Sequence, residues 1–93
     1  MAVLTDSEIQ AALGSLPGWQ KNGTAIQRSF EFPDFKTAMQ FVNKIADAAE
    51  QANHHPDIDI RYNKVIMALV SHDSGGVTHR DVRMAGKINE IAG

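Results

Sequence analysis

The sequence contains no cysteine, which excludes disulfide bonds, thiolate nucleophiles and thiolate metal ligands. It also has no apolar run close to the ~20 residues that a membrane-spanning helix requires, so we expect no membrane contact. Residues 1–10 lack the basic start and the long apolar segment of a secretory signal, which favours a cytoplasmic location. Catalytic groups or metal ligands must therefore be His, carboxylate, hydroxyl or amine side chains.

A concentrated positive charge is also missing. The nine Lys and Arg residues are scattered along the chain, and the net charge is -2 with neutral histidines. Nucleic-acid binding depends on concentrated neutralisation of phosphates, so we expect no direct contact with nucleic acid. The 93 residues, 43% of them apolar, are typical of one globular domain spanning 1–93.

The first third of the chain carries signals for one helix and one hairpin. Thr5 and Glu8 have the spacing of a capping box, which predicts a short helix ending at Gly14. The dipeptide Asn22-Gly23 predicts a hairpin turn before a strand at 24–32.

A long amphipathic helix is predicted next. Apolar residues recur at three- and four-residue intervals from Asp34 over nearly five turns. This helix must end near 53–55, because Pro56 disfavours helical geometry in the residue before it. His54 and His55 are therefore expected at a helix C-terminus.

The remaining chain predicts a second hairpin and a last helix. Residues 57–61 alternate as a strand does, 62–63 make a tight reversal, and 64–72 form an apolar strand. Thr78 and Asp81 offer an N-cap pair for the final helix. The order α-β-β-α-β-β-α predicts an α+β fold, in which a four-stranded antiparallel sheet has its helices packed on one face.

Three of the four histidines are candidates for a shared site. His54 and His55 are adjacent, and His72 ends a predicted strand on the same face as its half-buried apolar residues. A helix C-terminus favours one histidine through the helix dipole, but three imidazoles together cost desolvation and mutual repulsion. Spacing alone leaves the shared site and ordinary structural histidines as equal interpretations.

Two other chemistries fit these residue types less well. A metal site would use imidazoles and the nearby carboxylates Glu50, Asp57 and Asp73, but neither H-x-x-x-H nor H-E-x-x-H occurs. Ser71-His72-Asp73 has the residue types of a hydrolase triad, yet neighbours on a strand point to opposite faces. We therefore expect neither a metal centre nor a triad.

Asp81 has two interpretations that the sequence leaves open. It can be the capping-box partner of Thr78, or it can be a carboxylate that orients a nearby histidine. His79 directly follows the cap and is interpreted as a surface residue of the last helix.

An ordered pattern joins these candidates. It runs as Glu50, three residues, His54-His55-Pro56, five residues, Tyr62, nine residues, His72, eight residues and Asp81. The flanks add Leu16-Pro17-Gly18-Trp19 and the Phe-rich segment 30–35. Over nearly its whole length the chain thus resembles the pterin-4a-carbinolamine dehydratase family, which is also known as a dimerisation cofactor of a homeodomain transcription factor.

The resemblance implies an enzyme, a 4a-hydroxytetrahydrobiopterin dehydratase. Its reaction removes water from a 4a-hydroxytetrahydropterin to give the quinonoid dihydropterin, which recycles a tetrahydrobiopterin-type cofactor. The resemblance also implies a homodimer or homotetramer, an aromatic amino-acid hydroxylase upstream, and no metal or organic cofactor. The alternative is a non-catalytic protein-binding or dimerisation cofactor of the same fold.

The resemblance also assigns roles to residues. It implies that His54 and His72 form the acid-base pair, since imidazole exchanges protons near neutral pH, and that His55 binds and orients the pterin. It implies support of the imidazoles by Glu50 and Asp81, and pterin contacts from Asn53, Ile58 and Ser71. Three positions depart from the family pattern: Asn53 replaces a frequent Asp, Ile58 an aromatic, and His79 an acidic residue.

Overall fold

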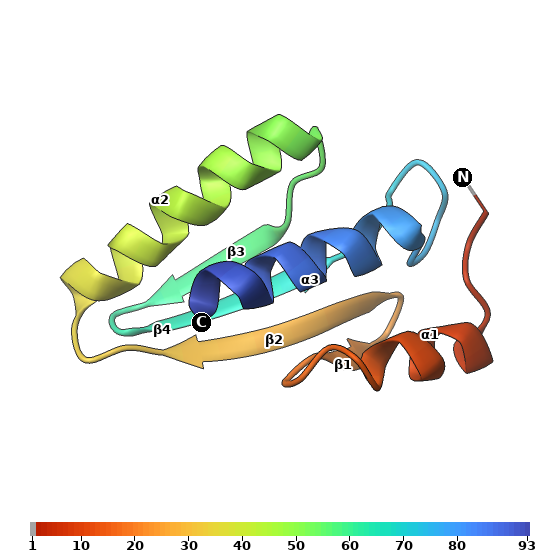
Figure 1. Ribbon diagram of the computed structural model, residues 1–93, viewed down its shortest axis with the longest axis horizontal. Coiled ribbons are helices and arrows are strands. Elements are labelled where there is room, and N and C mark those ends of the chain that lie inside the picture. Colours follow the sequence, from red (N-terminus) through yellow and green to blue (C-terminus); the bar gives the residue numbers. More distant parts are fainter. Residues whose placement is uncertain (1) are drawn as a thin grey trace.

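The computed structural model describes residues 2–93, which form three helices and a four-stranded sheet (Figure 1). The elements are α1 (Asp6–Leu13), β1 (Gln20–Asn22), β2 (Ala25–Glu31), α2 (Phe35–Ala52), β3 (Asp57–Arg61), β4 (Lys64–Leu69) and α3 (His79–Ala92). The predicted order α-β-β-α-β-β-α and the α+β class are confirmed.

The sheet has the strand order β1-β2-β4-β3, and every neighbouring pair is antiparallel. Each predicted hairpin forms one half of it, and β2 pairs with β4 at the centre, from Ile26 opposite Leu69 to Glu31 opposite Lys64. The reversal between β3 and β4 places Tyr62 at a φ of 55°, which a tight turn requires. The last strand in sequence, β4, is therefore a central strand of the sheet, and the chain continues from it into α3.

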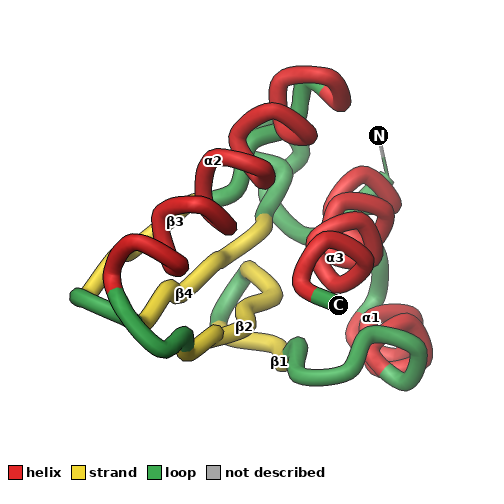
Figure 2. Tube along the Cα trace, turned by 60° about the vertical axis from the view of Figure 1, so that its left-hand side comes forward, coloured by secondary structure: helices red, strands yellow, loops and turns green. Residues whose placement is uncertain are grey.

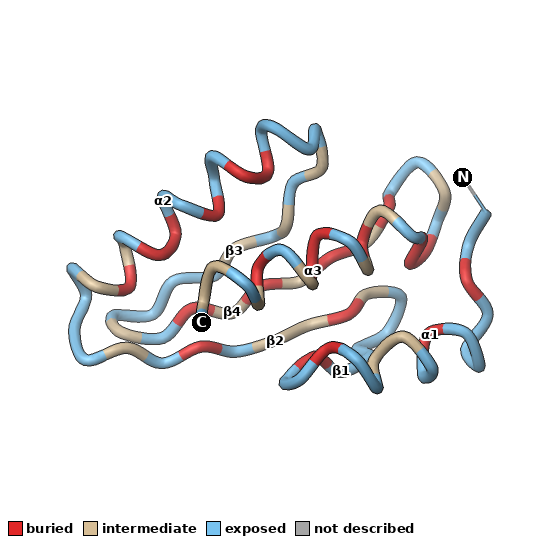
Figure 3. The backbone as a smooth tube through the Cα atoms, viewed as in Figure 1, coloured by how far each residue is buried: buried red, intermediate tan, exposed pale blue. Residues whose placement is uncertain are grey.

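Helices α2 and α3 cover one face of the sheet (Figure 2). In β4 the residues Val65, Met67 and Leu69 are fully buried, whereas Ile66 and Ala68 between them are only half-buried. Figure 3 shows the same alternation of buried and partly exposed positions along this strand. Each fully buried large apolar side chain contributes about 1.5–3 kcal/mol, so this one-sided core holds the helices in place.

The predicted helix boundaries are confirmed at the caps. Thr5 and Glu8 form a capping box at α1, and the Asp34 carboxylate accepts a hydrogen bond from the Thr37 amide at the start of α2. Helix α2 ends at Asn53, whose φ of 50° and ψ of 42° are left-handed. Asparagine tolerates this conformation better than most residues, so the chain can reverse here.

The predicted strand at 64–72 is wrong at its end, because β4 stops at Leu69. Ser71 forms an isolated bridge with Gly76, and its carbonyl accepts hydrogen bonds from the amides of Ser74 and Gly75. The chain thus closes a tight turn on Ser71, and His72 lies in that turn. None of the helices within residues 2–93 is both long and apolar enough to cross a membrane.

Candidate active site

His54 is positioned by the reversal that ends α2. After left-handed Asn53, the His54 amide donates to the Ala49 carbonyl at 3.1 Å, which fixes the backbone against the helix end. The imidazole is 11% exposed, and its Nε2 lies 2.5 Å from Oδ1 of Asp81. The contact between His54 and Asp81 therefore joins the segment after α2 to the first turn of α3.

Asp81 is completely buried and uses both carboxylate oxygens. Oδ1 faces His54, while Oδ2 accepts hydrogen bonds from the Thr78 amide and the Ser71 hydroxyl, each at 2.9 Å. Both interpretations of Asp81 thus describe the same side chain: one oxygen completes the capping box of α3 and the other contacts an imidazole.

The hydroxyls of Ser71 and Thr78 extend this network. They lie 2.8 Å apart, and Thr78 Oγ1 also accepts a hydrogen bond from the Arg80 amide. Because the Ser71 hydroxyl donates to Asp81, Thr78 is the donor to Ser71. Ser71 and Thr78 are both buried, so the carboxylate is held from two sides without help from solvent.

The network also sets the tautomer of His54. A carboxylate can only accept hydrogen bonds, so the Nε2–H of His54 donates to Asp81. Nδ1 is then the ring atom left to take or give a proton. An imidazole held this way by a buried carboxylate is suited to general acid-base chemistry.

His55 pairs with Glu50 in a different environment. Its Nε2 contacts Glu50 Oε2, as the family pattern suggested, but the two side chains are 55% and 77% exposed. Solvent and salt screen such a pair, so it orients His55 only weakly.

His72 is exposed in the turn after Ser71. No hydrogen bond or ion pair within residues 2–93 joins its side chain to His54 or His55. The turn itself is held by the next residue, because Asp73 accepts a hydrogen bond from Arg80 at 2.5 Å. That guanidinium keeps the pKa of the Asp73 carboxyl below its usual range.

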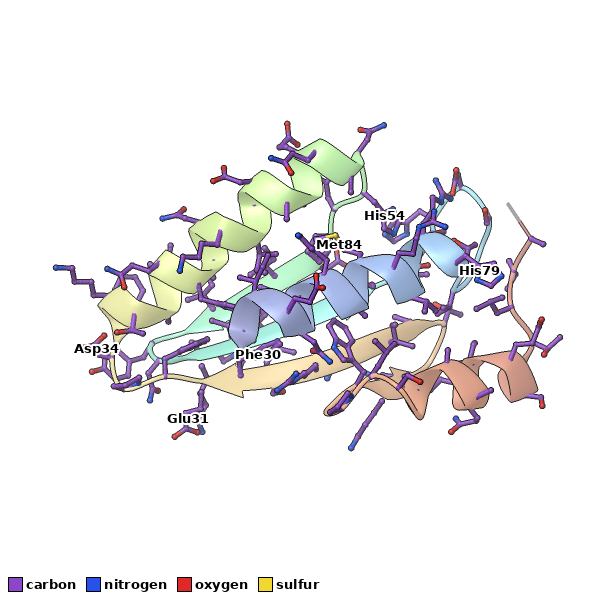
Figure 4. The ribbon with its side chains drawn as sticks, viewed as in Figure 1. Phe30, Glu31, Asp34, His54, His79 and Met84 are labelled. Atoms are coloured by element: carbon purple, nitrogen blue, oxygen red, sulfur yellow. The ribbon has the colours of Figure 1, made fainter. Side chains whose placement is uncertain are left out.

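His79 is exposed in the first turn of α3, in agreement with its interpretation as a surface residue. It lies near α1, where hydrogen bonds with Thr5 lower the pKa of the Glu8 carboxyl and the charge of His79 adds a smaller effect. Figure 4 shows His79 at the beginning of α3 and His54 beside Met84, near the end of α2.

A pocket of about 360 Å³ lies between the end of α2 and α3. Among the four histidines, His54 alone lines it. The remaining lining combines apolar, amide and cationic side chains: Ala48, Gln51, Ala52, Arg80, Arg83, Met84 and Lys87. The volume lies within the range of small-molecule sites.

The other predicted substrate contacts, Asn53, Ile58 and Ser71, do not line this pocket. Asn53 is exposed at the end of α2, Ile58 is half-buried against the core, and Ser71 is 1% exposed beneath Asp81. The sequence reasoning missed Thr78 as part of the hydrogen-bond network and the cations of α3. The spacing of 80, 83 and 87 on one predicted helix was the available signal. No group of three His, Asp or Glu side chains within 2–93 is arranged to hold a metal ion.

Comparisons with known proteins match nearly the whole chain to one family. Residues 2–91 match the family described as Pterin 4 alpha carbinolamine dehydratase. A Koribacter versatilis protein provisionally named pterin-4-alpha-carbinolamine dehydratase is 68% identical over 88 residues, which cover 95% of this chain and 94% of that protein. A Thermomicrobium roseum protein with the same provisional name is 48% identical over 99% of both chains.

Solved structures give the same result. A crystal structure described as a transcriptional coactivator/pterin dehydratase from Brucella melitensis has a TM-score of 0.94 and 47% identity, covering 98% of this chain and 99% of that one. A pterin dehydratase-like RuBisCO assembly factor of the alpha-carboxysome has a TM-score of 0.67 at 18% identity, over 81% of this chain and 87% of its own, and shares the fold. This chain belongs to the pterin-4a-carbinolamine dehydratase family.

Proposed function

We propose that this protein catalyses the dehydration of a 4a-hydroxytetrahydropterin to the quinonoid dihydropterin, with His54 in acid-base catalysis. The observation that carries the proposal is the contact between His54 and the buried Asp81 at the edge of a pocket. Asp81 fixes the proton on Nε2, so Nδ1 is free to exchange a proton with the substrate. Membership of the family supplies the substrate class.

The reaction needs two proton transfers. The C4a–O bond breaks and the hydroxyl leaves as water after it takes a proton, while the N5–H bond breaks and its electron pair forms the N5=C4a double bond. One positioned acid or base contributes about 10²- to 10⁴-fold to such a step. Two imidazoles, one donating and one accepting, meet this need without a metal or an organic cofactor.

We assign the second imidazole to His72. Its side chain is exposed, but it directly follows Ser71, whose hydroxyl lies 2.9 Å from Asp81. Consecutive Cα atoms are about 3.8 Å apart, so His72 is anchored one residue from the network that holds His54. The ion pair between Asp73 and Arg80 supports the same turn from its other side.

The remaining assignments follow from burial. His55, supported by Glu50, binds and orients the pterin from the solvent side, and Asn53 and Ile58 flank it. Ser71 is buried under Asp81, so we propose a positioning role for its hydroxyl in place of a direct pterin contact.

The wider role follows from the family and from one surface. We propose that the protein is cytoplasmic, recycles a tetrahydrobiopterin-type cofactor after an aromatic amino-acid hydroxylase, and assembles into dimers or tetramers. On the open face of the sheet, Ile66 and Ala68 of β4 are only half-buried, and this accessible apolar surface supports self-association. Light scattering of the purified protein tests its mass.

Stopped-flow turnover of a synthetic carbinolamine tests the catalytic proposal. We expect the wild-type protein to accelerate dehydration, and His54→Ala and His72→Ala each to lower the rate by about 10²-fold or more. His79→Ala is the matched control, because this histidine is exposed outside the network, and it should keep wild-type turnover. Full activity of His54→Ala in a folded protein would overturn the assignment. No acceleration by the wild type would favour the non-catalytic binding role.

A further inference from the structure

The pocket beside His54 is cationic. Three of its lining side chains, Arg80, Arg83 and Lys87, are cationic, and the lining residues drawn from 2–93 include no carboxylate. This local charge contrasts with the net charge of -2 for the whole chain. A pocket lined by one sign of charge attracts ligands of the opposite sign.

The three cations follow one line along α3. Their spacing of three and four residues places them on one helix face, over about 10 Å at 1.5 Å per residue. Arg80 is next to Asp81 and is therefore nearest to the His54 contact, whereas Lys87 is two turns further along. The pocket thus has a catalytic end and a cationic end.

These cations are only partly neutralised by the protein. Arg80 contacts Asp73, but its Nε is buried and has no hydrogen-bond partner within residues 2–93. Lys87 and Glu90 are 3.9 Å apart and both more than half exposed, which makes a weak pair. The guanidinium of Arg83 takes part in no hydrogen bond or ion pair of the described chain. Arg83 and Lys87 therefore keep most of their positive charge available to an anionic ligand.

We propose that the pterin accepted by this protein carries an anionic group, a phosphate or a carboxylate, at the end of its side chain. The inference rests on the proposed function, because the pterin ring must lie against His54. The apolar residues Ala48, Ala52 and Met84 then contact the pterin ring and the first atoms of the pterin side chain. The anionic end meets Arg83 and Lys87, and guanidinium groups bind phosphate and carboxylate through paired hydrogen bonds.

Calorimetry with a matched ligand pair tests the proposal. The probes are 7,8-dihydroneopterin and its 3′-phosphate, which differ only in the charged group. We expect the wild-type protein to bind the phosphate on the order of 10-fold more tightly, because charge-assisted hydrogen bonds are the stronger class. The preference should shrink as salt is raised, since the cations are solvent-accessible. A second pair, dihydrofolate and its dimethyl ester, measures the same preference for carboxylate.

The variant Arg83→Gln/Lys87→Gln locates the anion. The ratio of the two dissociation constants should fall to about 1 in this variant, because both charges are removed. The matched control is Lys36→Gln, which removes an exposed charge at the opposite end of α2 and should keep the wild-type ratio. Equal binding of both ligands by the wild type, binding of neither, or a preference retained in the double variant would overturn the proposal. The wild-type ratio decides even if the variant fails to fold.

Turnover separates this inference from the proposed function. Dehydration of a neutral carbinolamine without any preference for the anionic ligand would overturn the inference and leave the catalytic assignment standing. A preference for the phosphate without turnover of either carbinolamine would overturn the catalytic assignment and leave the anion site standing.

Discussion

Two imidazole-carboxylate pairs flank the turn after α2, and their surroundings are opposite. His54 is 11% exposed and contacts a fully buried Asp81, whereas His55 and Glu50 are both more than half exposed. The two histidines are adjacent in sequence, so the difference comes from the left-handed residue before them and from the docking of α3. Burial strengthens a hydrogen bond, whereas solvent screens it. Asp81 therefore fixes the position of the proton on His54 more strongly than Glu50 does on His55.

The comparison is tested most strongly by Asp81→Asn. The amide oxygen can keep the hydrogen bonds with Thr78 and Ser71, but the amide nitrogen then faces His54 and forces the proton onto Nδ1. We expect turnover to fall by about 10²- to 10⁴-fold, as wrong-tautomer substitutions do, with a loss of about 1–3 kcal/mol in unfolding free energy. Stopped-flow turnover and urea denaturation measure the two effects. Wild-type turnover in this variant would break the comparison.

Ser71→Ala sharpens the comparison by loosening the buried carboxylate. It removes one of two hydrogen bonds to Asp81 Oδ2, so we expect a loss of about 1 kcal/mol in stability and a several-fold fall in kcat. A positioning role predicts that kcat falls more than KM changes, and that Ser71→Thr, which restores a hydroxyl, recovers part of the rate. If kcat is unchanged while stability falls, the role of Ser71 is purely structural.

Glu50→Gln makes the same chemical change at the exposed pair. Because solvent can replace the lost hydrogen bond, we expect turnover within about 2-fold of wild type and no measurable change in stability. The measurement is the same turnover assay, run beside Asp81→Asn. An equal loss in both variants would show that burial does not distinguish the two pairs.

The last prediction concerns Asp34, an exposed carboxylate that has no histidine partner and affects stability alone. The backbone amide of Thr37 lowers the pKa of Asp34, so the unfolded state binds more protons and this cap stabilises the fold above the usual carboxyl range. The contribution is lost as pH falls through the lowered pKa. Asp34→Asn should therefore have a lower urea midpoint than wild type at about pH 7, and the two should converge as the pH falls through the lowered pKa of Asp34. A difference that grows in acid would contradict this sign.

The elements were predictable from the sequence because their signals are local. The capping boxes at Thr5 and Thr78, the turn at Asn22-Gly23 and the stop before Pro56 each depend on residues within a few positions of one another. Periodicity also predicts which face of each helix is buried, and hence a sheet covered on one side. The class and order of the fold follow from these signals.

The site depends on contacts that local signals do not contain. The alternating sequence pattern continues past Leu69, so His72 was expected within a strand. The pattern does not show that the Ser71 carbonyl accepts hydrogen bonds from amides of the following turn, which end the strand. The dual use of Asp81 depends on where α3 docks against the end of α2. The resemblance to the family indicated which residues belong to the site. The structure was needed to show which of the imidazoles is buried.

The contact between His54 and Asp81 also ties the site to the order of folding. The two residues are 27 positions apart, with the whole second hairpin between them. Loop closure over such a separation is unfavourable until β3 and β4 pair and α3 docks, so no partly folded chain holds the imidazole in its working tautomer. We therefore expect activity to recover late in refolding, when the last helix docks, and to lag behind the appearance of secondary structure.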